Sequence, residues 1–178
     1  IKPTLHGEMI WCQGYSEPNA GSDLASLQTK AELVNGEWVI NGQKIWTSTA
    51  QYAHMMFCLV RTEPDASKHA GISYLLIPMD TPGIEIRPLV DMTLKAGFNE
   101  VFFTDVKIPE TNIVGSRGEG WAVANATLGH ERGSLAPPDA IMSRLNTLIE
   151  LMQQETLDGK PLSDDSIYRD RLMKIQAK

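Results

Sequence analysis

The chain has 178 residues, of which 42% are hydrophobic and 21% are charged, and its formal net charge is −6 at pH 7. A chain of this length and composition can bury a sizeable core, which excludes an intrinsically disordered protein. The acidic balance gives no electrostatic reason to expect nucleic acid or an anionic membrane as a partner, because both favour a basic surface.

The first recognisable element is a loop, WCQGYSEPNAGSD at residues 11–23. Its Pro, Asn and Gly residues are typical of turns. Ser22 does not lie in the G-x-S-x-G pattern that exposes a serine nucleophile. Two roles stay open for its hydroxyl: a turn or helix cap together with Asp23, and a phosphate-facing group if the loop covers a ligand.

The next part of the chain, residues 27–108, has the pattern of short β-strands. Asn35-Gly36 and Asn41-Gly42 predict two consecutive hairpin turns. Further strands are predicted at residues 44–50, 54–62, 72–79, 83–89 and 99–108. The longest apolar run within them is far shorter than a membrane span. Short, evenly spaced strands without helices between them favour an antiparallel barrel or sandwich over a parallel sheet.

Helical periodicity replaces the strand pattern after Gly115. Helices are predicted over residues 120–134, over residues 141–152, and from residues 163–165 to the C-terminus. Pro137-Pro138 predicts a kink or a break between the first two, because a proline inside a helix loses a hydrogen bond and clashes with the preceding turn. Residues 158–161, DGKP, predict the end of the second helix.

Metal and nucleotide chemistry receive little support from the sequence. The four histidines are scattered, and Cys12 and Cys58 show neither ligand spacing nor a disulfide framework, so we expect no metal site and a reducing compartment. The segment GSRGEGW at residues 115–121 resembles a phosphate loop only loosely, since it lacks the Lys-Ser/Thr ending. A plain strand-to-helix connection is the favoured interpretation of these glycines.

Five motifs follow one another in an order and spacing that resemble the acyl-CoA dehydrogenase family. They are SEPNAGSD at residues 16–23, INGQKIWTS at 40–48, TPGIEI from residue 81, FTDVKIPETNIVG at 103–115, and a GxGW-led helix ending in HER at 130–132. The resemblance implies a mainly β fold with α: an antiparallel β-barrel middle domain at residues 1–115, then the beginning of a C-terminal helical domain at residues 116–178. The family's other helices would lie before Ile1 and after Lys178.

The resemblance also implies an activity. Members of this family remove a proton from the α carbon of an acyl-CoA thioester and pass a hydride from the β carbon to FAD, giving the 2-enoyl-CoA, as in fatty acid β-oxidation. It further implies a homo-oligomer, dimer or tetramer, that passes electrons to an electron-transferring flavoprotein. The expected location is the bacterial cytoplasm, or the mitochondrial matrix in a eukaryote. The 178-residue chain by itself is expected to fold but to be inactive.

Two alternatives to a dehydrogenase remain at this point. An acyl-CoA oxidase would share the fold and the flavin but would be reoxidised by oxygen. A β-barrel module that recognises CoA esters or partner proteins would carry no redox chemistry at all. Hydrogen peroxide production would distinguish the oxidase, and a colourless protein would distinguish the binding module.

By resemblance, the flavin contacts fall on two segments. They are Gln13, Tyr15, Ser16, Gly21 and Ser22 in the loop, and Trp46, Thr47 and Ser48 further along the chain. Ser16 would lie near the pyrimidine edge of the flavin, and Ser22 would face the cofactor pyrophosphate and the CoA ester. The Trp46 indole would lie against the isoalloxazine, with the Ser48 hydroxyl close to its reactive nitrogen. From the strand pattern alone, Trp46 is instead predicted to be a core residue.

The catalytic base is assigned by the same resemblance. A minority of the family carries a glutamate on the first long helix of the C-terminal domain, directly before an arginine, and Glu131-Arg132 matches this position. Burial beside an acyl chain would raise the pKa of Glu131 toward that of a useful base. Two alternatives stay open: a structural ion pair with Arg132, and a base beyond Lys178 as in most of the family. Substrate binding is assigned to Ser22, Glu131 and Arg132.

Overall fold

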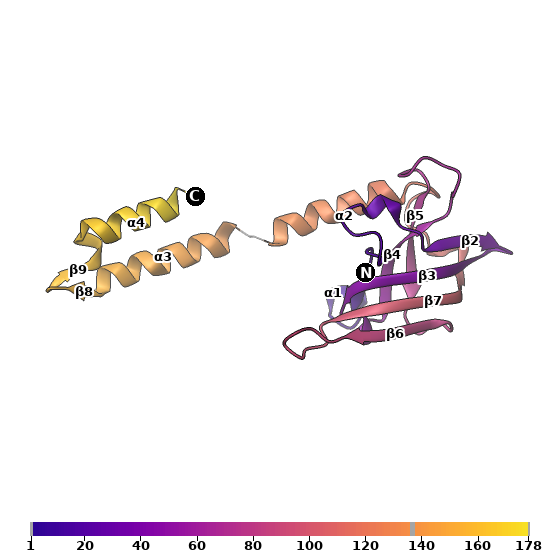
Figure 1. The fold of residues 1–178 in the computed structure, drawn as a ribbon, viewed down its shortest axis with the longest axis horizontal. Helices are drawn as coiled ribbons and strands as arrows, with labels where there is room; N and C mark the ends of the chain where they lie inside the picture. The colour runs from indigo at the N-terminus through magenta and orange to yellow at the C-terminus, as the bar shows by residue number, and fades with distance from the viewer. Residues whose placement is uncertain (1, 136–137, 178) are drawn as a thin grey trace. The chain divides into compact units, whose positions relative to one another are not determined.

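The computed structural model describes residues 2–135 and 138–177. Its internal contacts divide the chain into two units, Ile1–Thr127 and Leu128–Lys178. The first unit is built on a β-sheet, and the second is helical (Figure 1). Within the described residues, every helix is too short or too polar to traverse a lipid bilayer.

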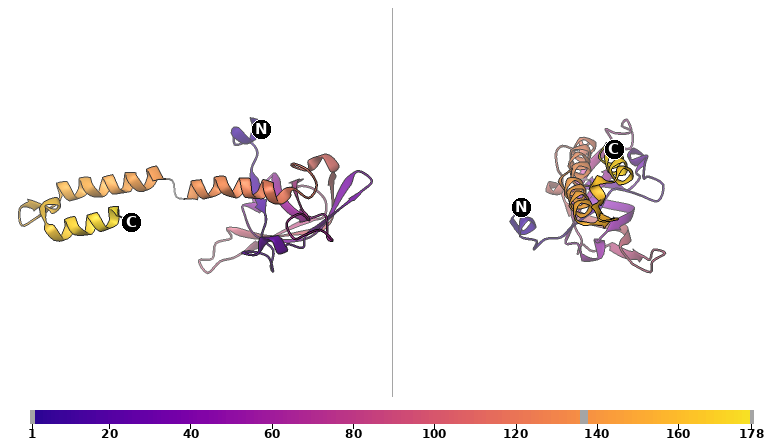
Figure 2. Two further views of the ribbon diagram at one scale, coloured as in Figure 1. Left: turned by 90° about the horizontal axis from the view of Figure 1, so that it is seen from above. Right: turned by 90° about the vertical axis from the view of Figure 1, so that its left-hand side faces the viewer.

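A seven-stranded sheet forms the first unit. Its strands are β1 (Trp11–Gly14), β2 (Lys30–Val34), β3 (Glu37–Ser48), β4 (Met55–Arg61), β5 (Ile72–Pro78), β6 (Ile84–Leu89) and β7 (Phe98–Pro109). Their order is β1-β4-β2-β3-β7-β6, with β5 on the other side of β4. The sheet curls into a half-barrel, as the two views in Figure 2 show. The predicted class, mainly β with α, is confirmed.

The pairing differs from the expected all-antiparallel pattern in one place. Strand β4 pairs in parallel with β1, with Trp11 opposite Met55 and Gly14 opposite Cys58. It also pairs in parallel with the start of β2. The remaining pairs of the sheet are antiparallel. The pairing of β1 with β4 joins segments more than 40 residues apart, so no local turn signal predicts it.

The first predicted hairpin turn is confirmed and the second is wrong. Asn35 and Gly36 join β2 to β3, and both have positive φ, 53° and 82°. At Asn41-Gly42, β3 continues without a turn, and its register with β7 shifts between Ile40 and Gly42. Gly42 has φ 149°, and a Cβ there would lie 2.6 Å from the Thr29 Oγ1 atom. This glycine therefore serves a β-bulge and a close backbone approach.

The core of the first unit is apolar and includes both cysteines. Its fully buried members include Trp38, Ile40, Met56, Val60, Leu75, Ile77, Val101 and Ile108. Burial raises the pKa of Cys12 to about 12, with a further contribution from Cys58. Burial likewise raises the pKa of Cys58 to about 11. Both thiols are free and protonated at neutral pH, so neither can act as a thiolate nucleophile or metal ligand.

The helices follow the sequence pattern closely. They are α2 (Gly120–Leu135), which begins in the first unit, and α3 (Pro138–Gln154) and α4 (Ser166–Gln176) in the second. The predicted break at Pro137-Pro138 falls partly outside the described residues, since Pro137 is not among them. Asp165 caps α4 by accepting hydrogen bonds from the backbone N–H groups of Ile167 and Tyr168. Strands β8 (Thr156–Leu157) and β9 (Lys160–Pro161) form a small hairpin, with Asp158 and Gly159 at its turn.

The short elements complete the description. Helix α1 (Lys2–Leu5) precedes β1, and 3-10 turns occur at η1 (Leu24–Ser26), η2 (Ala50–Tyr52), η3 (Glu110–Asn112) and η4 (Leu162–Asp164). Turn η1 follows directly after residues 15–23, because residues 11–14 of the predicted loop form β1. Turn η2 follows the end of β3. Both therefore flank the segments in which the sequence places its candidate cofactor residues.

Candidate cofactor site

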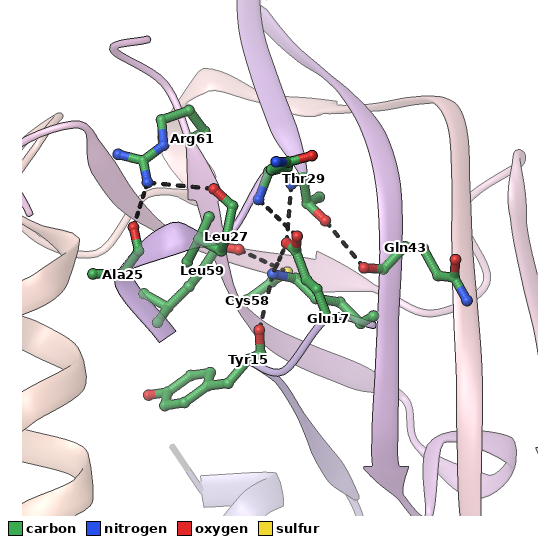
Figure 3. A network of polar contacts seen from close by, with 11 residues as sticks. Tyr15, Glu17, Ala25, Leu27, Thr29, Gln43, Cys58, Leu59 and Arg61 are labelled. Carbon is green, nitrogen blue, oxygen red and sulfur yellow. Dashed lines mark hydrogen bonds and ion pairs between the residues drawn. The ribbon is translucent and has the colours of Figure 1, made fainter. Parts of the chain in front are cut away.

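The loop that begins at Tyr15 is held against β3 by a buried ion pair. The Lys44 Nζ atom donates to the Glu17 Oε1 atom at 2.7 Å and to the Tyr15 carbonyl at 3.1 Å (Figure 3). The next residue, Ile45, donates its backbone N–H to the Ser16 carbonyl at 2.9 Å. Three successive loop residues are thus bonded to two successive residues of the strand.

The Glu17 carboxylate also closes the far end of the loop. It accepts the backbone N–H groups of Gln28 at 2.6 Å and Thr29 at 2.9 Å. Burial by itself would raise the pKa of Glu17, but the Lys44 charge and these donors outweigh it and hold the pKa below its ordinary value. Glu17 is therefore a buried, ionised anchor rather than the solvent-exposed turn residue that Glu-Pro suggests.

A third side chain holds the segment between the loop and β2. The Arg61 guanidinium donates to the Ala25 carbonyl at 2.7 Å and to the Leu27 carbonyl at 3.3 Å (Figure 3). At the loop's outer end, Lys68 forms an exposed ion pair with Asp23, with 2.6 Å between Nζ and Oδ2. The backbone on both sides of Gly21 and Ser22 is consequently fixed, while these two residues are exposed.

A β-bulge near the end of β3 turns Trp46 outward. Lys44 lies opposite Val101 of β7, and Thr47 lies opposite Asn99, so three steps on one strand match two on the other. Trp46 has φ 59° and its side chain is 60% exposed. Regular alternation would have placed it on the buried face together with Lys44, which explains why the strand pattern predicts a core residue.

The exposed indole lies beside a second aromatic side chain. Phe98, at the start of β7, meets Trp46 edge to face with 6.0 Å between ring centroids, and Phe98 lies opposite Ser48 in the sheet. The Ser48 side chain is exposed on the same strand end as Trp46. Sequence reasoning missed Phe98, although its position at the start of the strand paired with the W-T-S segment is a usable signal.

Thr47 points to the opposite side, into the protein. Its Oγ1 atom and the Oδ1 atom of Asn99 are the two buried side-chain polar atoms without a partner in the described part of the chain. The Asn99 amide nitrogen is satisfied by the Thr47 carbonyl at 2.9 Å and Gln51 Oε1 at 2.6 Å. Unsatisfied buried polar atoms are rare in folded proteins, and each one calls for an explanation.

The other expected loop residues lie in different surroundings. The Tyr15 ring is buried, packs edge to face on Phe57 and Tyr74, and has its hydroxyl 3.3 Å from that of Tyr74. Gln13 is half-buried in β1, and Ser16 is half-buried behind its carbonyl bond to Ile45. Tyr15 therefore anchors the loop through its backbone carbonyl and its packed ring.

Among the expected cofactor residues, Trp46, Ser22 and Ser48 have exposed side chains. They offer one flat apolar ring and two hydroxyls, which are groups of the kind that bind a flat heteroaromatic ring with a polar rim. Within the described residues, no group of three or more His, Cys, Asp and Glu side chains could hold a metal ion.

Glu131 and Arg132 lie on α2, in the second unit, and both are exposed in this chain. The loop and the 46–48 segment come together within the first unit. The role of Glu131 and Arg132 in the site is a prediction from the resemblance.

The glycine-rich segment before α2 is explained by packing. A Cβ at Gly120 would lie 2.4 Å from the Ser73 carbonyl carbon of β5, so only glycine fits at this contact. Gly118 has φ 83° and donates its N–H to the Ser73 hydroxyl at 2.9 Å. Arg117 forms an ion pair with Glu63. These contacts agree with the strand-to-helix interpretation of this segment.

Comparison with known proteins identifies the family. The family model of the acyl-CoA dehydrogenase middle domain matches residues 12–106, and that of the acyl-CoA dehydrogenase C-terminal domain matches residues 118–178. The chain belongs to the acyl-CoA dehydrogenase family. Members of this family are flavin-dependent oxidoreductases.

Single proteins with known names are similar to this chain in sequence, in structure or in both. Acyl-CoA dehydrogenase IpdE1 of Mycobacterium tuberculosis is 50% identical over 92% of this chain and 42% of its own length. The ChsE4-ChsE5 complex from Mycobacterium tuberculosis has 35% identity, a TM-score of 0.80, and coverage of 98% of this chain and 45% of that one. The structure of PigA with FAD and proline shares the fold, with 24% identity and a TM-score of 0.87. The match covers 99% of this chain and 47% of PigA. The chain thus spans less than half the length of these proteins.

Proposed function

We propose that the natural protein is an FAD-dependent acyl-CoA dehydrogenase that converts an acyl-CoA thioester to the 2-enoyl-CoA. The observation that carries this proposal is the outward-turned Trp46, held at the end of β3 next to the anchored loop. The 50% identity to IpdE1, an acyl-CoA dehydrogenase, supports the reaction class. FAD is the proposed cofactor because PigA, of the same fold, carries it.

The roles of the cofactor-site residues follow from their chemistry. Bound FAD would supply the acceptor for the β-hydrogen and its electron pair. Trp46 would cover one face of the ring and exclude water from it. Ser48 would donate a hydrogen bond to the ring edge, and Ser16 and the Gln13 and Tyr15 backbone would line the opposite edge. Gly21 and Ser22 would face the pyrophosphate and the thioester, and the buried Thr47 would contribute through its backbone.

The proposed base is Glu131. Its carboxylate would take the α-proton as the α,β double bond forms, and Arg132 would hold the carboxylate and the thioester in position. A carboxylate needs a raised pKa for this work, which burial by a bound acyl chain would provide. Glu131 is exposed in this chain, so the bound substrate must supply the desolvation.

The partners are proposed from the family. The ChsE4-ChsE5 structure is a complex of two chains, which supports an oligomeric assembly for the natural protein. An electron-transferring flavoprotein is the proposed electron acceptor. The mycobacterial relative supports a bacterial source, and the cytoplasm is the proposed location.

The test is anaerobic flavin reduction. The natural full-length protein should purify yellow, and its flavin absorbance should bleach when an acyl-CoA is added without oxygen. Bleaching without hydrogen peroxide in air supports a dehydrogenase, and rapid peroxide formation would identify an oxidase. A colourless protein that does not take up FAD would overturn the proposal in favour of a binding module.

A further inference from the structure

The buried ion pair of Lys44 and Glu17 occupies an unusual place for two charges. Their side chains are 0% and 8% exposed, so solubility or surface electrostatics cannot account for them. Lysine and glutamate are almost never fully buried unless they are paired and hydrogen-bonded. Such a pair is weak evidence for stability, because apolar residues of similar volume often stabilise a core as well. Its presence calls for a role that apolar residues could not fill.

The bonds of this pair join three separate segments. Lys44 bonds the loop at Tyr15 and Glu17, and Glu17 bonds the backbone of Gln28 and Thr29. The loop that contains Gly21 and Ser22 therefore begins and ends on one carboxylate. An apolar side chain at residue 17 could fill the space but could accept neither N–H group.

The pair is also adjacent to the bulge. Lys44 is the last residue of β3 in regular register with β7 before the shift, and Trp46 follows two residues later. Ile45, between them, bonds the Ser16 carbonyl. The position of the loop and the position of the indole are thus set from the same point of the strand.

We propose that the buried Lys44–Glu17 pair is the positioning unit of the cofactor site, fixing both ends of the 17–29 loop against β3 beside Trp46. The proposal rests on the proposed function, since it assigns the loop to the flavin. Neither residue has an exposed charge that could contact the cofactor, so both act through the residues that they hold. They are positioning residues, not catalytic ones.

The experiment compares four variants of the natural protein. Lys44→Met removes the cation, and Glu17→Gln removes the anion with little change of shape. Lys30→Met is the matched control, because Lys30 forms an exposed ion pair with Glu32 at 3.2 Å on β2. Leu75→Ala is the stability control, since Leu75 is fully buried in β5 and belongs to neither segment of the site.

Two measurements decide the outcome. Amide hydrogen exchange is measured on the cofactor-free protein, and the FAD dissociation constant is measured by flavin fluorescence. In Lys44→Met and Glu17→Gln we expect exchange at Gln28 and Thr29 to accelerate, and the FAD dissociation constant to rise, by about tenfold or more. Lys30→Met should change neither, and Leu75→Ala should lower Tm while keeping FAD affinity within about twofold of wild type.

Two results would overturn the inference. One is unchanged exchange at residues 28 and 29 in both site variants. The other is a loss of FAD affinity in Leu75→Ala as large as in Glu17→Gln at equal loss of Tm, which would mean a general effect of stability. If Lys44→Met does not fold, Glu17→Gln gives the deciding result. A wild-type protein that does not bind FAD would refute the proposed function, and the exchange data would still show whether the pair holds the loop.

Discussion

The Lys44 ammonium lies 2.7 Å from the Glu17 carboxylate inside the protein, and this contact makes the site sensitive to acid. Although burial opposes it, the Lys44 charge lowers the pKa of Glu17 below its ordinary value of 4.5. A carboxyl group with a lowered pKa in the folded state stabilises the protein above its ordinary pKa, and this stabilisation is lost as pH falls through the folded-state pKa.

We therefore expect the free energy of unfolding to fall as pH is lowered from about 4.5, and Glu17→Gln to make this fall shallower by up to about 1.4 kcal/mol per pH unit. Urea unfolding at a series of pH values measures the free energy of unfolding of wild type and variant. Asp23, Glu85 and Asp91 also have a lowered pKa because of side-chain hydrogen bonds, so wild type and variant both retain some acid sensitivity. Equal slopes for wild type and Glu17→Gln would contradict the expectation.

Trp46 should matter for the cofactor more than for the fold. Because its side chain is 60% exposed, we expect Trp46→Ala to change the free energy of unfolding by less than about 1 kcal/mol and to weaken FAD binding. Trp38→Ala is the contrast, since that indole is fully buried and its loss should cost about 3–5 kcal/mol. Thermal unfolding and FAD titration of both variants give the comparison. Undiminished FAD affinity in Trp46→Ala would remove the indole from the proposed site.

Two glycines of α2 should respond oppositely to alanine. At Gly120 the added Cβ would meet the Ser73 backbone at 2.4 Å, so we expect Gly120→Ala to destabilise the protein by about 2 kcal/mol or more. At Gly129 no atom lies within 4 Å of the added Cβ, and alanine should stabilise the helix by up to about 1 kcal/mol. Chemical denaturation measures both. Similar effects of the two substitutions would argue against the tight contact between α2 and β5.

The two cysteines should be unreactive in the folded protein. Burial raises the pKa of Cys12 to about 12 and that of Cys58 to about 11, so the thiolate form is scarce at neutral pH. Both side chains are also buried, so a reagent in solution cannot reach the sulfur atoms. We expect a thiol reagent at pH 8 to modify neither cysteine in the native protein and both after denaturation. Mass spectrometry of the treated protein gives the number of modified cysteines. Rapid native labelling would mean that the region around β1 opens readily.

Glu131→Gln tests the proposed base. In the full-length protein we expect it to abolish exchange of the substrate α-proton with solvent and to leave FAD bound. Glu150→Gln changes another exposed glutamate, on α3, and should leave exchange at the wild-type rate. Proton exchange is followed by NMR of the acyl-CoA in heavy water. Full exchange in Glu131→Gln would place the base elsewhere in the protein.

Much of the fold could be predicted from local patterns. Strands β4 to β7, the Asn35-Gly36 turn and the start of α4 follow from alternation, turn chemistry and a capping aspartate, all of which act over a few residues. The Asn41-Gly42 turn was wrong because the same dipeptide also suits a bulge, and the neighbouring Thr29 backbone decides between the two. The parallel pairing of β1 with β4 depends on distant segments and leaves no local trace.

The site was harder to predict than the fold. The resemblance pointed to the loop and to residues 46–48, and the fold brings these segments together. The anchoring role of Glu17 could not be predicted, because its partner Lys44 lies 27 residues away and no sequence pattern links the two. A lysine at an inward position of an apolar strand is nevertheless a signal, since burial of its charge requires a carboxylate nearby.

The bulge at Trp46 also restricts which changes of length this strand can tolerate. Before the bulge the buried side chains of β3 are at even-numbered positions, and after it the buried side chain, Thr47, is at an odd-numbered position. Deleting Ile45 would restore a simple two-residue repeat in which Lys44 and Thr47 both point inward, and the indole between them would keep its outward face. A one-residue deletion elsewhere in β3 would instead move the side chains on one side of it to the opposite face of the sheet.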